Sequence, residues 1–209
     1  MMKKTLAGEL PFSAIILAAG LSSRFGKPKA FLKFSGKESF LERLLQVYLE
    51  AQVNKIVIVV NRDIEKETEA LVGSFAEKQN ITVVLNKHPE AGRFTSIKLG
   101  AAAVEKTSAV FIQNTDNPFT SSSLLQGMMS MLQAGKYVVP VWNHEKGHPA
   151  LLSPAIAQRI RDTADARANL RDLLDEFESM EWTSAEERIH ANINTRTEYQ
   201  KYFAHEEIF

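Results

Sequence analysis

Short runs of hydrophobic residues recur along the chain and alternate with stretches in which hydrophobic residues return at helical spacing. The run Ile56–Val60 consists entirely of isoleucine and valine and is the clearest of them. Uninterrupted runs of this kind are typical of strands that are buried on both faces of a parallel sheet. The pattern predicts strands over Ser13–Ala18, Lys55–Asn61, Ile81–Leu85, Ala109–Gln113, Tyr137–Val141 and Arg188–Ile193.

Helical patterns lie between and after these runs. Within Glu38–Ala51, hydrophobic residues recur at spacings of three and four, so that they share one face. Alternating strands and helices predict an α/β fold: a doubly wound, mostly parallel sheet in three α/β/α layers, in which ligands bind beyond the carboxyl ends of the strands. The predicted helices are Glu38–Ala51, Ile64–Lys78, Thr95–Lys106, Ser121–Gln133, Pro154–Asp162, Asn169–Phe177 and Thr197–Phe203.

Length and composition narrow the class of protein. The 209 residues contain no repeat or long linker, so we expect one domain over residues 13–209, preceded by a leader of residues 1–12. The 25 Lys and Arg balance the 25 Asp and Glu, which argues against a general nucleic-acid binder. The longest uncharged stretch, Asn117–Gly135, is too polar to span a membrane. With no cysteine, disulfides and thiolate chemistry are excluded, and we expect a cytoplasmic protein.

The loop after the first predicted strand has the composition of a phosphate-binding loop. Its sequence over Leu17–Lys29 is LAAGLSSRFGKPK, in which small residues allow backbone N–H groups to approach a ligand closely. It carries three cations, Arg24, Lys27 and Lys29. Five residues separate Gly20 from Gly26, so the loop is not a Walker loop, and G-x-G-x-x-G is also absent. On composition alone, a solvated basic turn is the alternative.

The pattern L-A-A-G-x-S-x-R-F-G-x-x-K resembles the signature loop of the nucleotidyltransferases that include molybdenum cofactor cytidylyltransferase and guanylyltransferase. The resemblance covers nearly the whole chain after residue 12 and implies a Rossmann-like nucleotidyltransferase fold. In that family the loop holds a nucleoside triphosphate, and an Arg and a Lys neutralise its phosphates. The resemblance therefore assigns catalytic charge neutralisation to Arg24 and Lys29, and nucleotide binding to Leu17, Ala18, Ala19, Gly20 and Ser22.

The loop after the third predicted strand supplies a second candidate region. By resemblance, Gly92 and Ser96 lie against the base and ribose of the nucleotide. A helix N-cap at Thr95 or Ser96 is the structural alternative, and it is compatible with ligand binding.

Asp116 follows the fourth predicted strand and precedes a proline at 118. A carboxylate at the end of a central strand can hold Mg²⁺ against phosphate oxygens, although a turn or capping aspartate is the plainer interpretation. The family carries Asp-x-Pro here as its principal metal ligand, and the first residue of Asn192-Ile-Asn194-Thr gives a second contact. The resemblance thus predicts a Mg²⁺ site at Asp116 and Asn192, with Asp116 also catalytic.

The segment Gly147-His148-Pro149 resembles a feature that lines the acceptor side in the cytidylyltransferase branch. We therefore assign acceptor binding, and no acid–base role, to Gly147 and His148; a packed loop histidine is the alternative. Arg171, on a predicted helix, is interpreted as part of a solvated face.

Together these features predict transfer of a nucleoside monophosphate from a nucleoside triphosphate, CTP or GTP with CTP favoured, to a small phosphorylated acceptor such as molybdopterin, with release of pyrophosphate. One alternative is a nucleotidyltransferase that acts on a sugar phosphate or another alcohol phosphate. Another is a catalytically weak nucleotide-binding or regulatory module, suggested by the asparagines at 117 and 192. We expect a monomer or a small homo-oligomer.

Overall fold

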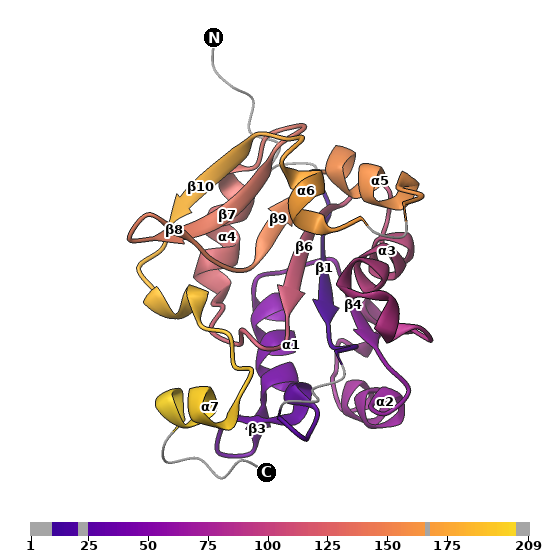
Figure 1. Cartoon of the computed structure of the whole chain (residues 1–209), viewed down its shortest axis with the longest axis vertical. Coiled ribbons are helices and arrows are strands. Elements are labelled where there is room, and N and C mark those ends of the chain that lie inside the picture. Colours follow the sequence, from indigo (N-terminus) through magenta and orange to yellow (C-terminus); the bar gives the residue numbers. More distant parts are fainter. Residues whose placement is uncertain (1–9, 21–24, 166–167, 204–209) are drawn as a thin grey trace.

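A computed structural model describes residues 10–20, 25–165 and 168–203, and an eight-stranded sheet lies at its centre (Figure 1). The strands are ordered β10-β7-β9-β6-β1-β4-β5, and β8 pairs with β7. A separate two-stranded sheet joins β2 (Lys33–Ser35) to β3 (Glu38–Ser39). The strands of the main sheet are β1 (Phe12–Leu17), β4 (Lys55–Val60), β5 (Ile81–Leu85), β6 (Ala109–Asn114), β7 (Tyr137–Trp142), β8 (Glu145–Lys146), β9 (Ala150–Leu152) and β10 (Ser179–Thr183).

Parallel strands form the half of the sheet that contains β1. β1 pairs in parallel with both β4 and β6, and Leu17 at its end aligns with Val59 and Asn114. All six residues of β1 are buried, as the uninterrupted hydrophobic run predicts. The ends of β1, β4 and β6 therefore meet at one edge of the sheet, where the loops that follow them come together.

Helices cover both faces of this sheet. Ile16, Ile58 and Phe111 point to one face, and Ile15, Val57 and Ile112 to the other, each set within its own buried cluster. The first face is covered by α1 (Phe40–Glu50), α2 (Glu65–Gly73) and α4 (Ser122–Met131), and the second by α3 (Arg93–Ala103), α5 (Pro154–Asp162) and α6 (Leu170–Leu174). The predicted three-layer, doubly wound fold is confirmed.

Local signals set the helix ends. α1 begins after a capping box in which Ser39 and Glu42 satisfy each other's backbone N–H groups. α7 (Arg196–Tyr202) begins with a second capping box and packs its aromatic residues near β2, away from the main sheet (Figure 1). None of the helices in the described residues is long and apolar enough to cross a membrane. Short 3-10 turns complete the order: Lys29–Phe31, Lys78–Asn80, Pro89–Ala91 and Glu187–His190.

The predicted strand Arg188–Ile193 is wrong. Its alternate residues are buried as expected, but the segment begins as the 3-10 turn Glu187–His190 and then crosses the loop after β6. The side-chain amide of Asn117 donates to the carbonyls of Ile189 (2.9 Å) and Ala191 (2.8 Å). The backbone of this segment thus bonds to a side chain and a loop instead of a neighbouring strand.

The edge strand of that part of the sheet is β10, which the hydrophobic pattern did not predict. β10 runs parallel to β7, and β9 lies antiparallel between β6 and β7. β10 is half exposed and β9 has only three residues, so neither produces a long hydrophobic run.

Candidate functional site

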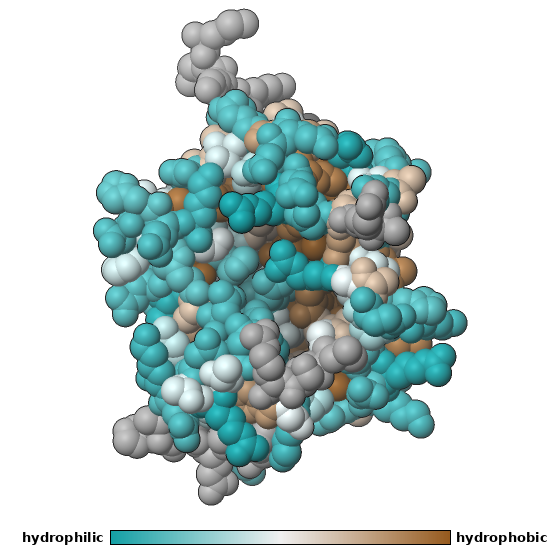
Figure 2. Space-filling model, in the orientation of Figure 1, coloured by the Kyte–Doolittle hydropathy of each residue, from teal (hydrophilic) through white to brown (hydrophobic). Residues whose placement is uncertain are grey.

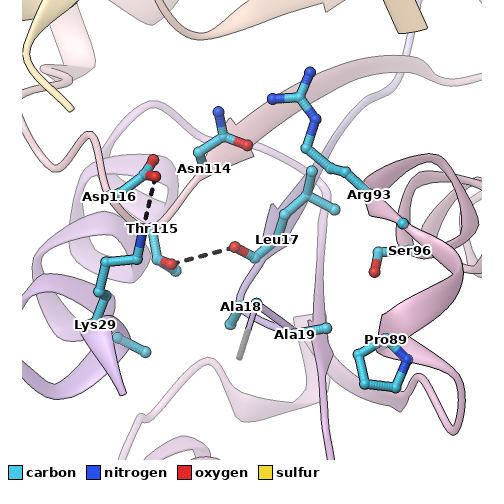
Figure 3. A pocket seen from close by; sticks show the side chains of 13 residues that line it. Leu17, Ala18, Ala19, Lys29, Pro89, Arg93, Ser96, Asn114, Thr115 and Asp116 are labelled. Carbon is cyan, nitrogen blue, oxygen red and sulfur yellow. Dashed lines mark hydrogen bonds and ion pairs between the residues drawn. The ribbon is translucent and has the colours of Figure 1, made fainter. Parts of the chain in front are cut away.

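A cavity of about 190 Å³ opens at the carboxyl ends of β1 and β6 (Figure 3). Three regions far apart in the chain meet there, and they contain most of the residues predicted to bind the nucleotide. Leu17, Ala18, Ala19, Gly20, Lys29, Ala30, Pro89, Gly92, Arg93, Ser96, Asn114, Thr115 and Asp116 line the cavity. Arg24 and Ser22, which were predicted with this group, lie outside the described residues.

Hydrogen bonds fix the strand ends that form the cavity floor. The Thr115 hydroxyl donates to the carbonyl of Leu17 at 3.2 Å, and the Thr115 backbone N–H donates to the same oxygen. The buried Asn61 side chain donates to the carbonyl of Ala19 at 3.2 Å. The small residues after β1 are thereby tied to their neighbours on both sides, which leaves the loop backbone fixed beside the cavity.

Lys29 bridges the loop after β1 and the loop after β6. Its Nζ donates to Asp116 Oδ2 at 3.0 Å and to Asn194 Oδ1 at 2.9 Å. The Lys29 and Asp116 side chains are only 17% and 21% exposed, so the pair is partly shielded from solvent. Lys29, predicted to neutralise phosphates, and Asp116, predicted to hold Mg²⁺, therefore share one end of the cavity.

Asp116 also has an oxygen suited to a cation. Its Oδ1 is buried and has no hydrogen-bond partner among the described residues. Oxygen ligands of this type suit Mg²⁺, which commonly uses one or two carboxylates together with substrate phosphates. The described residues contain no group of three or more His, Cys, Asp or Glu that could hold a metal alone. The residues present therefore fit an ion that arrives with a polyphosphate.

Asn192 and Asn194, on the segment before α7, have different partners. The amide of Asn192 donates to the carbonyl of His190 at 3.2 Å, and this residue does not line the cavity. Asn194 instead reaches Lys29, as described above. Its backbone N–H donates to Glu198 Oε2 at 2.7 Å, which fixes it at the start of α7. The metal role of Asn192 stays a prediction, and Asn194 joins the candidate residues.

The opposite wall comes from the start of α3. Gly92 precedes this helix with φ +96°, a conformation that a residue with a side chain adopts only under strain. Ser96, one turn into the helix, is buried at 5% exposure and lines the cavity. In Figure 3, Pro89 and Ser96 lie across the cavity from Lys29 and Asp116. The wall is thus formed by a helix N-terminus whose backbone approaches the cavity closely.

A second cavity of about 590 Å³ adjoins the first and shares Arg93 and Asn114 with it. Figure 2 shows a hollow near the middle of this face, with hydrophobic residues within it and hydrophilic residues around it. The lining combines cations with a hydrophobic floor. Its residues are Arg93, Ile112, Asn114, Tyr137, Val139, Lys146, Gly147, His148, Ala150, Leu170, Arg171, Leu174 and Asp175.

Gly147 and His148 line this second cavity and also hold the C-terminal segment. A Cβ on Gly147 would lie 2.7 Å from Ile189 Cγ1, and the His148 N–H donates to the Ile189 carbonyl at 3.0 Å. Burial lowers the pKa of His148, the charges of Arg93 and His190 lower it further, and Asp116 opposes them. The imidazole is therefore neutral near neutral pH, which suits a hydrogen-bonding role.

Several residues of the two cavities were missed from the sequence. Arg93 and Asn114 line both cavities, while Lys146 and Arg171 line the second. Asn114 could have been found, since it directly follows the predicted central strand Ala109–Gln113. Lys146 and Arg171 gave no such signal, because the hairpin β7–β8 and the short helix α6 bring them together from separate parts of the chain.

Comparison with known proteins relates this chain to nucleotidyltransferases. Residues 14–181 match the family described as the MobA-like NTP transferase domain. The chain is 30% identical to the molybdenum cofactor cytidylyltransferase of Escherichia coli over 148 residues, which cover 70% of this chain and 73% of that enzyme. It is 28% identical to the 2-C-methyl-D-erythritol 4-phosphate cytidylyltransferase of Thermosipho melanesiensis over 54% of this chain and 50% of that enzyme. A nucleotidyl transferase structure from Methanothermobacter thermautotroptrophicus superposes with a TM-score of 0.76 at 20% identity, covering 93% of this chain and 97% of the other.

Proposed function

Because the chain belongs to the MobA-like NTP transferase domain family, we propose that it transfers a nucleoside monophosphate from a nucleoside triphosphate to a phosphorylated acceptor. One observation carries the proposal: the loops after β1 and β6 converge on one cavity, where Lys29 and Asp116 are in contact. Two adjoining cavities that share Arg93 and Asn114 suit a reaction between two substrates.

We assign the smaller cavity to the nucleoside triphosphate. The backbone of residues 17–20 and the ammonium of Lys29 offer hydrogen bonds and positive charge to phosphate oxygens. Arg24 and Ser22 are proposed for the same role on the resemblance of the loop. Gly92 and Ser96, on the other wall, would contact the base and ribose.

The proposed chemistry is a displacement at phosphorus. A phosphate oxygen of the acceptor attacks the α-phosphorus, a P–O bond forms, and the bond to the β-phosphate breaks so that pyrophosphate leaves. A phosphate is already ionised near neutral pH, so the site needs no general base. The residues act by positioning both substrates and by stabilising the negative charge that develops.

Asp116 would hold a Mg²⁺ ion that accompanies the triphosphate, through the oxygen that has no protein partner among the described residues. Asn192 is proposed as a second contact, and Asn194 lies close enough to Lys29 to contribute to the same end of the site. Bound Mg²⁺ supplies charge neutralisation of the phosphates and orients them.

The larger cavity would receive the acceptor, with Gly147 and His148 in its wall. Arg93, Lys146 and Arg171 provide cations for phosphate groups, and residues such as Ile112 and Leu174 provide a hydrophobic floor. This mixture favours an acceptor that combines a phosphate with a flat or hydrophobic body, in keeping with molybdopterin. CTP is the favoured donor.

The similarity to an enzyme named for 2-C-methyl-D-erythritol 4-phosphate supports a second candidate, an alcohol phosphate acceptor. Pyrophosphate release in the presence of Mg²⁺, measured with each pairing of CTP or GTP with molybdopterin, an alcohol phosphate or a sugar phosphate, tests both. Release with molybdopterin supports the first candidate, and release with an alcohol or sugar phosphate alone supports the second. If no triphosphate binds in the presence of Mg²⁺, the proposed function is wrong.

A further inference from the structure

A buried glutamine contacts the turn that follows β6. Gln113, near the end of this strand, is 0% exposed. Its Oε1 accepts hydrogen bonds from the hydroxyls of Tyr48 at 3.1 Å and Thr120 at 3.0 Å. Its Nε2 donates to the carbonyls of Asn114 and Asn117, each at 2.8 Å. Gln113 lines neither cavity, so it can influence a ligand only through the residues that it holds.

The atoms around Gln113 fix the direction in which its amide points. A carbonyl oxygen can only accept, so the atom that faces Asn114 and Asn117 must be the NH₂ group. This group has two hydrogens, and each carbonyl takes one of them. The amide oxygen then faces two hydroxyls, both of which can donate to it. The buried amide is therefore fully hydrogen-bonded in a single orientation, which makes it a rigid support for the turn.

The two carbonyls lie at the two ends of the turn that presents Asp116. Asn114 and Asn117 flank this aspartate, and the turn's own bond, from the second N–H to the first carbonyl, is long at 3.3 Å. The Asp116 carbonyl accepts from the Ile193 N–H at 2.7 Å, but that donor belongs to the C-terminal segment. Gln113 adds two shorter bonds from β6 itself and so ties both ends of the turn to the sheet.

We propose that Gln113 is a positioning residue for metal binding: by holding both ends of the turn, it keeps the Asp116 carboxylate where a complex of Mg²⁺ and triphosphate can bind to it. This inference rests on the proposed function, since it takes Asp116 as a ligand of that ion. The turn determines where the buried, unpartnered Oδ1 of Asp116 lies, and also where Oδ2 meets Lys29. Removing a group that supports a metal ligand commonly costs about 10–100-fold in metal affinity or activity.

The test removes hydrogens that face the turn and keeps the shape of the side chain. In Gln113→Glu the carboxyl group offers at most one hydrogen, whether ionised or protonated, where the amide offers two. CTP or GTP, whichever the wild type binds more tightly, is titrated by calorimetry once with Mg²⁺ and once with EDTA. The ratio Kd(EDTA)/Kd(Mg²⁺), which measures how far Mg²⁺ strengthens binding, should fall roughly 10-fold. No acceptor is present, so the result does not depend on turnover.

Tyr48→Phe is the matched control. It removes one hydrogen bond from the same buried amide but leaves both bonds to the turn, and Thr120 still donates to Oε1. This variant should be less stable than the wild type, and its Kd(EDTA)/Kd(Mg²⁺) ratio should be unchanged. An equal fall of the ratio in Tyr48→Phe overturns the inference, because general loosening of the core would then account for both variants.

Asp116→Asn shows whether Gln113 acts through the carboxylate. Alone it should lower the ratio at least as much as Gln113→Glu does, and adding Gln113→Glu should lower it no further. A further fall in the double variant overturns the inference. A wild-type ratio in folded Gln113→Glu also overturns it, as does a wild-type protein whose triphosphate binding Mg²⁺ does not strengthen.

Gln113→Met, which has a similar length and buries no charge, replaces Gln113→Glu if that variant does not fold, and the same fall of the ratio is expected. If neither variant folds while Tyr48→Phe does, the glutamine serves folding of the whole chain and the inference is overturned. A wild-type protein that binds neither CTP nor GTP contradicts the proposed function instead.

Discussion

Lys29 Nζ lies 3.0 Å from Asp116 Oδ2, although 87 positions separate the two residues in the chain. The pair joins the loop after β1 to the loop after β6, and each side chain is mostly shielded from solvent. An ion pair of this kind contributes little net stability, about 1 kcal/mol or less when partly exposed. Its value lies in placing a cation and a carboxylate where phosphates and a metal would meet.

Replacing Asp116 with asparagine should therefore remove activity and leave the fold intact. Asp116→Asn keeps the size of the side chain but loses the charge that would hold Mg²⁺. We expect pyrophosphate release to fall about 10²–10³-fold, the usual loss for one electrostatic contact with a reacting group. The free energy of unfolding, measured by thermal denaturation, should change by no more than about 1 kcal/mol.

Asp162→Asn is the matched control, because Asp162 is an exposed aspartate on α5 that lines neither cavity. This variant should retain wild-type activity. Near-normal pyrophosphate release by Asp116→Asn in Mg²⁺ would contradict the assignment of Asp116.

The parallel part of the fold could be predicted from the sequence because its strands are buried on both faces. β5 and α5 have the predicted bounds, and β1, β4 and β6 differ by a residue at one or both ends. The prediction of a strand over Arg188–Ile193 failed because the alternation of hydrophobic and polar residues there does not come from pairing in a sheet. Ile189, Ala191 and Ile193 are buried against the loop after β6, and a period of two does not reveal whether the backbone pairs with a strand.

The candidate site also contains some residues that the sequence could predict and others that it could not. The loop after β1 and Asp116 follow hydrophobic strands directly, so their meeting at one edge follows from sheet geometry. Arg93 and Lys146 reach the cavities through a helix start and a hairpin, and no local pattern marks them. Lys29 contacts Asn194 and not Asn192, because Glu198 fixes the turn before α7.

The lowered pKa of His148 predicts a component of stability that depends on pH. Above the ordinary value of 6.5 the ring is neutral in the folded and the unfolded chain. As pH falls through 6.5 toward the lower folded-state pKa, the unfolded chain binds the proton first, so the free energy of unfolding decreases. Urea denaturation over this range should show the decrease in the wild type and a smaller one in His148→Asn.

His144 is exposed and serves as the comparison for that measurement. His144→Asn should keep the wild-type decrease, since the remaining carboxylates and His148 are unchanged. If the free energy of unfolding falls equally steeply with pH below 6.5 in the wild type and in His148→Asn, burial does not hold the imidazole neutral.

Gly100 should be intolerant of alanine despite its position inside a helix. A Cβ at this position would lie 2.4 Å from Ile15 Cγ2, where α3 packs on β1. Alanine normally stabilises a helix by up to about 1 kcal/mol relative to glycine. Overpacking costs about 1–3 kcal/mol, so Gly100→Ala should be destabilising overall. Gly73→Ala, at the exposed end of α2 with no atom within 4 Å, should be neutral or stabilising in the same denaturation experiment.

Arg171 gives a test of the acceptor cavity. Its side chain lines only the larger cavity, so Arg171→Gln should weaken acceptor binding and leave triphosphate binding unchanged. Loss of one charged hydrogen bond to a phosphate is worth about 1.5–3 kcal/mol, which corresponds to about a 10–150-fold increase in the acceptor KM. Arg159→Gln is the control, because Arg159 pairs with Glu176 on the surface and lines neither cavity. An unchanged acceptor KM in Arg171→Gln, or an equal effect of Arg159→Gln, would exclude Arg171 from the acceptor site. A weaker Kd for the triphosphate alone would indicate that the two cavities do not divide the substrates as proposed, since Arg171 lines the larger cavity and not the smaller one.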